Sequence, residues 1–352
     1  MTTALAIIAA VLAVSLLIVV HEAGHLLAAR LFGMRVERFS VGFGPVLLSF
    51  RRGDTEYAIS ALPLGGYVKI RGMAAAEEVD QADPTAYANQ APWRRFLVIL
   101  AGPAMNYLAA VALAAGLLLT VGLSAPDPTA SVGKLAPGMP AEQAGLRPGD
   151  RVVSVAGRPV DSWDALVREL RGHPGVTIPL VVERGEGASA AQLTLPVTPR
   201  DDGGIGRVGF GQYAILVTRG SFAPAVAGAL ARTNDLVVAQ IAAFKNVFSR
   251  GKGAELSGPV GIAQQLVRAA RVGAGPFLTL VWLISVVLAV LNLLPVPALD
   301  GGRLVFLGYE IVTRRRVNSR VENALHLVGF IALVALILGV TVFGDLARLR
   351  GR

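Results

Sequence analysis

Two histidines and a glutamate stand together at the end of an uncharged apolar stretch. Residues 1–20 carry no charged side chain, and residues 21–25 read His-Glu-Ala-Gly-His. His21 and His25 lie on one face of a helix, so both can reach one metal ion, and Glu22 can then act on metal-activated water. Polar groups at membrane depth are costly, and a shared metal ion gives these residues a reason to be there.

A catalytic zinc site uses three protein ligands, so the histidine pair needs a partner. The chain has no cysteine and only two other histidines: His173, which we expect in a surface turn, and His326, which we expect in helix packing. Asp300 closes the sequence Asn292-Leu-Leu-Pro-Val-Pro-Ala-Leu-Asp300, whose two prolines break or kink a helix. Irregular backbone at membrane depth is tolerated where it lines a cavity. We therefore expect Asp300 to be the third ligand.

The composition points to a membrane protein with several spans. Of the 352 residues, 53% are hydrophobic and 16% are charged, which is too apolar for a soluble chain of this length. Four segments, at about 3–31, 96–123, 277–299 and 324–344, are long enough to cross a bilayer. The net charge of +9 fits basic residues that flank spans, and no basic stripe with interleaved aromatics favours nucleic acid.

Basic residues in short connections predict the orientation of the spans. Arginines follow the first span, precede the second and lie between the third and fourth, so these connections are expected to be cytoplasmic. Three arginines in the tail at 346–352 disagree with this, and the three concordant flanks outweigh them. The first segment lacks a basic start and a clear small-residue cleavage site, which argues against a cleaved signal peptide.

Patterning between the spans predicts two β-containing regions. Alternation broken by glycines over 36–71 predicts strands, followed by a polar loop at 73–92. Residues 128–200 predict a small α/β module, with strands near 152–155 and 178–182 and a helix near 163–170. Residues 222–249 have the periodicity of an amphipathic helix, lying on the membrane or against the soluble domain.

The expected fold is therefore a polytopic α-helical membrane protein with about four transmembrane helices, a membrane-associated β-hairpin region and one extracytoplasmic α/β domain. Along the chain we expect a first span at 1–35, a cytoplasmic-side hairpin and loop at 36–94, a second span at 95–123, the extracytoplasmic domain at 124–212, an amphipathic helical linker at 213–275, a third span at 276–300, a cytoplasmic loop at 301–322, a fourth span at 323–345 and a tail at 346–352.

Two motifs in this order resemble a known family. HExxH in the first span followed by NxxPxPxLDG in a later one is similar to the site-2 protease family of intramembrane zinc metalloproteases. One further stretch resembles the family's GPxxN element, two resemble its bacterial regulator-of-sigma-E branch, and one resembles the PAxxAGLxPGD signature of bacterial PDZ domains. They are GPAMN at 102–106, GGYVK at 65–69, LSGPVG at 256–261 and, for the PDZ signature, PAEQAGLRPGD at 140–150.

The resemblance implies roles for particular residues. His21, His25 and Asp300 would bind one Zn²⁺, and Glu22 would be the general base and then the proton donor to the leaving amine. In the implied substrate site, Asn292 would hold the substrate backbone, with Asn106 either similar or a helix-packing residue. The hairpin at Gly65, Gly66 and Tyr67 would pair with an unwound substrate segment through its edge.

The implied enzyme is a multi-pass protein of the bacterial inner (plasma) membrane, with its active site towards the cytoplasm. It would cleave transmembrane segments of single-span proteins in regulated intramembrane proteolysis, for example anti-sigma factors or signal-peptide remnants. The single PDZ domain would bind a peptide or exclude bulky substrates. Two alternatives stay open: an inactive membrane PDZ adaptor with a vestigial metal site, and a transporter, which is weaker because no inverted repeat is visible. The intact Glu22 favours the enzyme.

Overall fold

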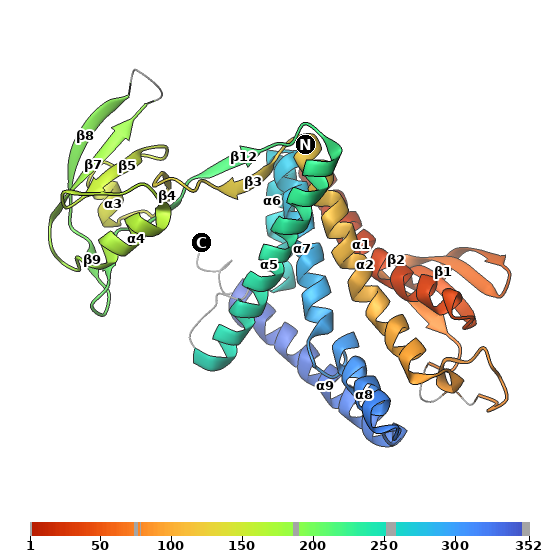
Figure 1. Cartoon of the computed structure of the whole chain (residues 1–352). Coiled ribbons are helices and arrows are strands. Elements are labelled where there is room, and N and C mark those ends of the chain that lie inside the picture. The colour runs from red at the N-terminus through yellow and green to blue at the C-terminus, as the bar shows by residue number, and fades with distance from the viewer. Residues whose placement is uncertain (1, 74–76, 78, 186–189, 251–257, 347–352) are drawn as a thin grey trace. The chain divides into compact units, whose positions relative to one another are not determined.

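In the computed structural model, the chain forms two compact units (Figure 1). One unit combines Met1–Val121 with Thr218–Arg352, and the other is Gly122–Val217. The residues described are 2–73, 77, 79–185, 190–250 and 258–346. Most of the predicted tail at 346–352, and the first two residues of the LSGPVG motif, lie outside them.

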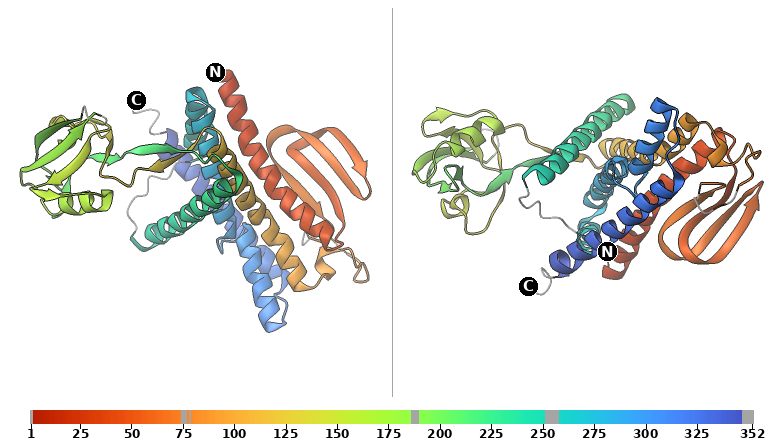
Figure 2. Two further views of the ribbon diagram at one scale, coloured as in Figure 1. Left: turned by 45° about the horizontal axis from the view of Figure 1, so that its top comes forward. Right: turned by 90° about the horizontal axis from the view of Figure 1, so that it is seen from below.

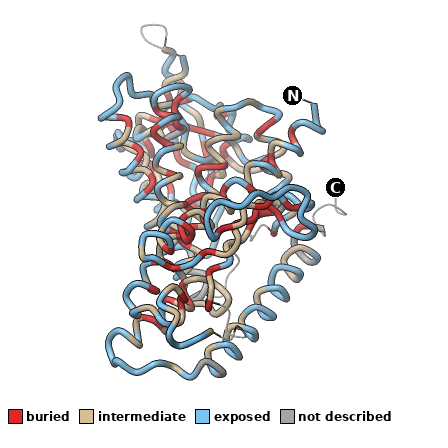
Figure 3. Tube along the Cα trace, turned by 90° about the vertical axis from the view of Figure 1, so that its right-hand side faces the viewer, coloured by how far each residue is buried: buried red, intermediate tan, exposed pale blue. Residues whose placement is uncertain are grey.

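The first unit confirms the four expected apolar spans. Helices that are long and apolar enough to cross a membrane run over Thr3–Leu31 (α1), Pro92–Leu119 (α2), Ala274–Leu293 (α7) and, within α9 (Ser319–Gly339) and its continuation, Val321–Val342. α2 packs against both α1 and α7. Many residues of these helices are exposed (Figure 3). Large apolar side chains are among them, as expected of surfaces that meet lipid rather than water.

Small residues bring α1 and α2 into close contact. A side chain at Gly24 would place its Cβ 2.2 Å from the carbonyl oxygen of Ala101, so only glycine fits at this crossing. Glycine at a membrane helix interface allows the two backbones to approach and pack directly. This crossing lies within one turn of both His21 and His25 and therefore fixes α2 against the histidine pair.

The chain after α7 breaks as the two prolines predicted, but the segment beyond it is not a loop. α7 ends at Leu293, and a new helix, α8 (Asp300–Thr313), begins at Asp300. The first part of the predicted cytoplasmic loop at 301–322 is therefore helical. Gly301 is buried so tightly that a Cβ would lie 2.0 Å from the carbonyl oxygen of Leu294, which lets α8 fold back onto the broken segment.

The segment expected to be an amphipathic linker begins with a strand and contains two helices. They are β12 (Ala214–Val217), α5 (Phe222–Arg250) and α6 (Pro259–Val272). α5 packs on α2 and α7, where the Tyr107 hydroxyl donates to Asn234 Oδ1 at 2.7 Å. α6 packs on α1, and its first N–H groups are capped by the carboxylate of Asp345, which accepts from the backbone of Gly258 at 3.0 Å and Gly261 at 2.8 Å.

Two long strands beside α1 form a sheet that is wider than the expected hairpin (Figure 2). β1 (Val36–Arg52) and β2 (Thr55–Ile70) are antiparallel, but Phe39 pairs with both Tyr57 and Val68. Each strand therefore bends, and the sheet is four segments wide. From one edge to the other, the segments are 66–70, 36–41, 55–60 and 46–52.

The two edges of this sheet differ in character. The edge 46–52 exposes Leu47, Leu48 and Phe50 by 65, 68 and 65%. The edge 66–70 instead lies along α1, where a Cβ on Gly66 would come within 3.5 Å of Val19. One edge thus carries exposed apolar side chains, and the other runs beside the helix that holds the histidine pair.

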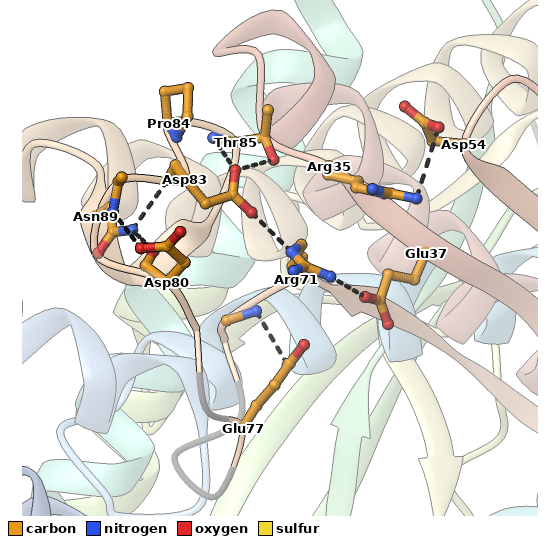
Figure 4. Close-up of polar contacts among 12 residues, drawn as sticks. Arg35, Glu37, Asp54, Arg71, Glu77, Asp80, Asp83, Pro84, Thr85 and Asn89 are labelled. Carbon is orange, nitrogen blue, oxygen red and sulfur yellow. Dashed lines mark hydrogen bonds and ion pairs between the residues drawn. The ribbon is translucent and has the colours of Figure 1, made fainter.

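A polar network ties the segment after β2 to the sheet (Figure 4). Arg71 contacts Asp83 at 2.8 Å and Glu37 at 3.5 Å, and Asp83 also accepts from the hydroxyl and N–H of Thr85. These hydrogen bonds, with Thr85 contributing most, lower the pKa of Asp83 to about 2. The described part of the expected polar loop also contains a short 3-10 helix, η1 (Tyr87–Asn89), before α2 begins.

The second unit is a small α/β fold with its own core. Its four-stranded antiparallel sheet has the order β6-β5-β7-β8, and Val152, Leu166 and Leu180 are among its fully buried residues. The strands of this sheet are β5 (Arg151–Val155), β6 (Arg158–Pro159), β7 (Ile178–Arg184) and β8 (Ala191–Val197). The helices are α3 (Pro140–Gln143) and α4 (Trp163–Arg171). Further strands are β3 (Leu123–Pro126), β4 (Val132–Leu135), β9 (Arg200–Asp201), β10 (Gly206–Arg207) and β11 (Phe210–Gln212). The unit is longer at both ends than the predicted 124–212, because β3 and β12 pair as a two-stranded ribbon.

Candidate metal centre

The structure brings together the three residues that the sequence separates by up to 279 positions. His21 and His25 project from one face of α1, and Asp300 is the first residue of α8. Asp300 Oδ2 lies 3.0 Å from His21 Nε2 and 3.4 Å from His25 Nε2. The two Nε2 atoms are 3.2 Å apart, and all three donor atoms fall within 4.8 Å of one another.

The outer nitrogens of both rings are held by α2. His25 Nδ1 lies 2.8 Å from the carbonyl oxygen of Val98, which only accepts, so the proton is on Nδ1 and the lone pair is on Nε2. His21 Nδ1 lies 3.4 Å from the Asn106 amide, whose Oδ1 has no partner in the described structure. Amide orientation is an assignment, and turning the amide over gives Oδ1 the N–H of His21 to accept.

With these tautomers, three acceptors face one another. Each Nε2 presents a lone pair, and Asp300 Oδ2 is a buried oxygen without a hydrogen-bond donor among the described residues. Such a cluster is repulsive unless a cation lies between the three atoms. Two imidazoles and one carboxylate, each oriented by an outer hydrogen bond or by its helix, match the ligand set of a catalytic zinc site that keeps one position open.

Glu22 stands beside the three ligands and is oriented by the sheet. Its Oε2 accepts a 3.0 Å hydrogen bond from the N–H of Val68 in the edge segment of β2. Glu22, Val68 and the three ligands line one pocket of about 430 Å³. The rest of its lining is Met73, Ala298, Leu299, Arg303, His326, Leu327 and Phe330.

Gly102 on α2 closes the other side of the ligand cluster. A Cβ at this position would lie 2.4 Å from His25 Nε2 and 2.8 Å from His21 Nε2. Pro103 follows inside the helix and removes one N–H from its hydrogen-bond ladder. The GPxxN stretch thus supplies a residue without a side chain, a local break and, at Asn106, a partner for His21.

The remaining predicted site residues do not line this pocket within the described structure. Asn292 is in the last turn of α7, and Asn106 is fully buried behind His21. Gly65, Gly66 and Tyr67 lie on the strand that enters the pocket one residue later, at Val68.

Sequence reasoning missed several residues that orient the ligands or line the pocket. Val98 acts through its backbone carbonyl, which leaves no signal in the sequence, and Gly102 acts through its missing side chain, whose only signal is its place in the GPxxN motif. His326 was assigned to helix packing, yet it lines the pocket and accepts a hydrogen bond from Ala298.

The chain is similar to known proteins over nearly its whole length. The model of peptidase family M50 matches residues 9–336. A Clostridium perfringens protein is 35% identical over 340 residues, which cover 96% of this chain and 97% of the relative. A Mesorhizobium japonicum protein is 33% identical over 363 residues, covering 94% and 96%, and a Clostridium acetobutylicum protein is 30% identical over 342 residues, covering 96% of both chains. All three carry the provisional name of zinc metalloprotease.

The tight fit at Gly102 makes a specific prediction about metal binding. Gly102→Ala would drive a methyl group into both ligand rings, so we expect zinc affinity to fall by at least ~10-fold, as it does when ligand orientation is disturbed. Metal content of the purified protein, measured by mass spectrometry, checks this. Gly116→Ala is the matched control, because it adds the same methyl group to α2 where nothing lies within 4 Å. Equal zinc content in the two variants would contradict the role given to Gly102.

Proposed function

The chain belongs to peptidase family M50, and we propose that it is an intramembrane zinc endopeptidase that cleaves single-span membrane proteins within or near the bilayer. One observation carries the proposal: a His-His-Asp ligand set and an oriented glutamate meet between helices apolar enough to cross a membrane. A hydrolytic site inside the apolar part of a chain has little use for a soluble substrate.

Zinc held by His21, His25 and Asp300 would polarise the scissile carbonyl and make water more acidic. Glu22 would take a proton from the attacking water and pass it to the leaving amine nitrogen as the peptide bond breaks. The hydrogen bond from Val68 fixes one oxygen of this carboxylate, so the base is aimed before the substrate enters.

A substrate helix must unwind before its backbone can be attacked, because a helix in lipid satisfies its own hydrogen bonds. The edge segment 66–70 offers a partner for the unwound strand at the entrance to the pocket. Gly65, Gly66 and Tyr67 would contact the substrate here, and Asn292 would lie farther along its path. Asn106 would act as a positioning residue for His21.

We place the protein in the bacterial inner membrane as a multi-pass chain. The arginine-rich connections favour an active site towards the cytoplasm and an extracytoplasmic Gly122–Val217 unit. The exposed apolar edge 46–52 supports contact of the sheet with lipid. By family resemblance, anti-sigma factors and signal-peptide remnants are the proposed substrates.

We propose that the Gly122–Val217 unit is a PDZ domain that binds an extended peptide. A groove of about 560 Å³ runs between α4 and the segment 205–210. Trp163, Val167 and Leu170 line it from one side of α4, and Phe210 lines it at the start of β11. A strand beside a helix with apolar residues between them is the arrangement that adds a peptide to a sheet edge.

The competing hypothesis is an inactive adaptor with a vestigial site. Its weakness is Glu22, which has no adaptor function yet is held by a backbone N–H in the metal pocket.

Glu22→Gln tests the proposed activity. The amide cannot take a proton from water, so cleavage of a purified single-span substrate in detergent or liposomes should fall by at least ~10²-fold, within the range of general base catalysis. Zinc content should equal that of the wild type, because Glu22 is not a ligand. Equal processing by both proteins would reject the enzyme.

A disulfide test addresses the edge segment. The chain has no native cysteine, so single cysteines can be placed freely. In the Glu22→Gln background, Tyr67→Cys should form a disulfide with a cysteine near the scissile bond of a substrate. Leu48→Cys, on the opposite edge, should not. Cross-linking of equal yield at both positions would contradict edge pairing at 66–70.

Peptide binding by the second unit has its own test. Val167→Asp places a charge in the groove, and affinity for a fluorescent extended peptide with apolar residues should fall at least ~10-fold in the full chain, the loss expected from burying an unpaired charge. Arg168→Asp puts the same residue on the exposed side of α4 and should leave binding intact. Unchanged affinity in Val167→Asp would remove the groove as the peptide site.

A further inference from the structure

His326 lines the metal pocket and has no part in the chemistry described above. It comes from α9 and lines the same pocket as the histidine pair. Its position is fixed by close packing, since a Cβ at Gly329, one turn later, would lie 2.5 Å from Pro297 Cβ. A histidine at such a place is either a ligand, a base or a donor, and its hydrogen bonds decide between these roles.

The tautomer of His326 follows from one contact. The backbone N–H of Ala298 donates to His326 Nδ1 at 2.9 Å, so Nδ1 carries the lone pair. The neutral ring then has its proton on Nε2. With the lone pair engaged by Ala298 and a proton on Nε2, the ring has no free nitrogen to bind a metal ion or to act as a base. It can only donate.

The Nε2–H group lacks an acceptor. This nitrogen is buried and has no partner in the parts of the chain that the structure describes. A buried donor without an acceptor is costly, and such groups in native proteins call for an explanation. The ring borders the pocket that holds His21, Glu22 and Asp300, and also a second cavity lined by Glu310 and Glu322, neither of which accepts a hydrogen bond from Nε2.

The residue that fixes the His326 ring, Ala298, has a strained backbone conformation. Ala298 has φ of 83°, a conformation that a residue with a side chain rarely adopts. The hydrogen bond to His326 spans from α9 to this residue, two positions before the metal ligand Asp300. The donor and the ligand therefore belong to one rigid piece of structure, as a preorganised site requires.

We propose that His326 is a further catalytic residue, whose Nε2–H donates a hydrogen bond to the scissile carbonyl oxygen as that oxygen gains negative charge. The inference rests on the proposed proteolysis. The water oxygen bonds to the carbonyl carbon, its proton goes to Glu22, and the C–N bond breaks as that proton passes to the amine nitrogen. His326 keeps its proton throughout. Its contribution is electrostatic and is made when the charge develops.

Arg303 is the rival donor in the same pocket. It stands one turn after Asp300 on α8 and carries a full charge on a flexible stem. A long arginine is less preorganised than a ring fixed at one nitrogen, so the geometry favours His326. An Arg303→Gln variant distinguishes the two donors.

The test compares His326→Phe, His326→Gln and Arg303→Gln with the wild type. Loss of an oxyanion donor lowers kcat by about 10²–10³-fold. We expect this loss in His326→Phe with KM and zinc content nearly unchanged, and partial recovery in His326→Gln, whose amide can accept from Ala298 and still donate. Affinity for a peptide phosphonamidate, whose phosphoryl oxygens imitate the charged carbonyl oxygen, should fall in parallel with kcat. The affinity of the Glu22→Gln/His326→Phe double variant for uncleaved substrate should match that of Glu22→Gln.

Three outcomes would overturn the inference. Wild-type kcat in His326→Phe removes the donor role. Joint loss of zinc and activity makes His326 a support for the Asp300 segment instead. A loss of phosphonamidate affinity in Arg303→Gln but not in His326→Phe assigns the donor to the arginine. None of these outcomes contradicts the proposed proteolytic activity, which is rejected only if Glu22→Gln cleaves the substrate like the wild type.

Discussion

The whole site depends on the electrostatic repulsion between three ligand atoms. The fold brings these atoms together, and a bound cation would remove the repulsion. Three atoms with lone pairs, Nε2 of His21, Nε2 of His25 and Oδ2 of Asp300, stand within hydrogen-bonding distance of one another without a proton to share between them. The polypeptide holds them there by engaging the outer ring nitrogens elsewhere, at Val98 and Asn106. Since both of these residues are on α2, a helix that carries no ligand determines how the two histidine rings point. The free energy of metal binding must then offset the cost of assembling the cluster, so the geometry of the site and its affinity for a cation are two aspects of one arrangement.

The helices can pack closely enough to form this ligand cluster because three positions carry no side chain. Gly24 lets α1 meet α2, Gly102 leaves space for the two rings, and Gly301 lets α8 turn back towards them. Each of these positions would clash with backbone or ligand atoms if it carried a Cβ. The prolines act from the other side, since they end α7 at Leu293 and allow Asp300 to start a new helix rather than to extend the old one. In an apolar environment, where backbone groups must be satisfied locally, such a break is tolerated only because neighbouring helices enclose it.

The sequence predicts the parts of the molecule that depend on local chemistry. Spacing alone places the two histidines on one helical face, and apolar length alone predicts the spans. The bent sheet could not be predicted from the sequence. Phe39 pairs with both Tyr57 and Val68, and this pairing depends on tertiary structure, which the alternation of apolar and polar residues does not specify. α8 was missed because Asp-Gly-Gly is typical of a turn, while the burial of Gly301 under the carbonyl of Leu294 is visible only in the folded chain. The roles of Val98 and His326 were missed for a similar reason: one acts through its backbone, and the other acquires its tautomer from a residue 28 positions away.

The hydrogen bond between Val68 and Glu22 connects two functions that sequence analysis treats separately. Val68 belongs to the strand proposed to pair with substrate, and its N–H is the group that orients the proposed base. The Val68 N–H that donates to Glu22 faces away from segment 36–41, so it lies on the side of this edge where an added strand would bind through the other outward-facing groups of 66–70. A substrate strand that pairs there would stiffen the segment which aims the carboxylate. Binding energy from residues remote from the scissile bond would then improve the position of the base, which is how an enzyme uses binding to favour the transition state over the bound substrate.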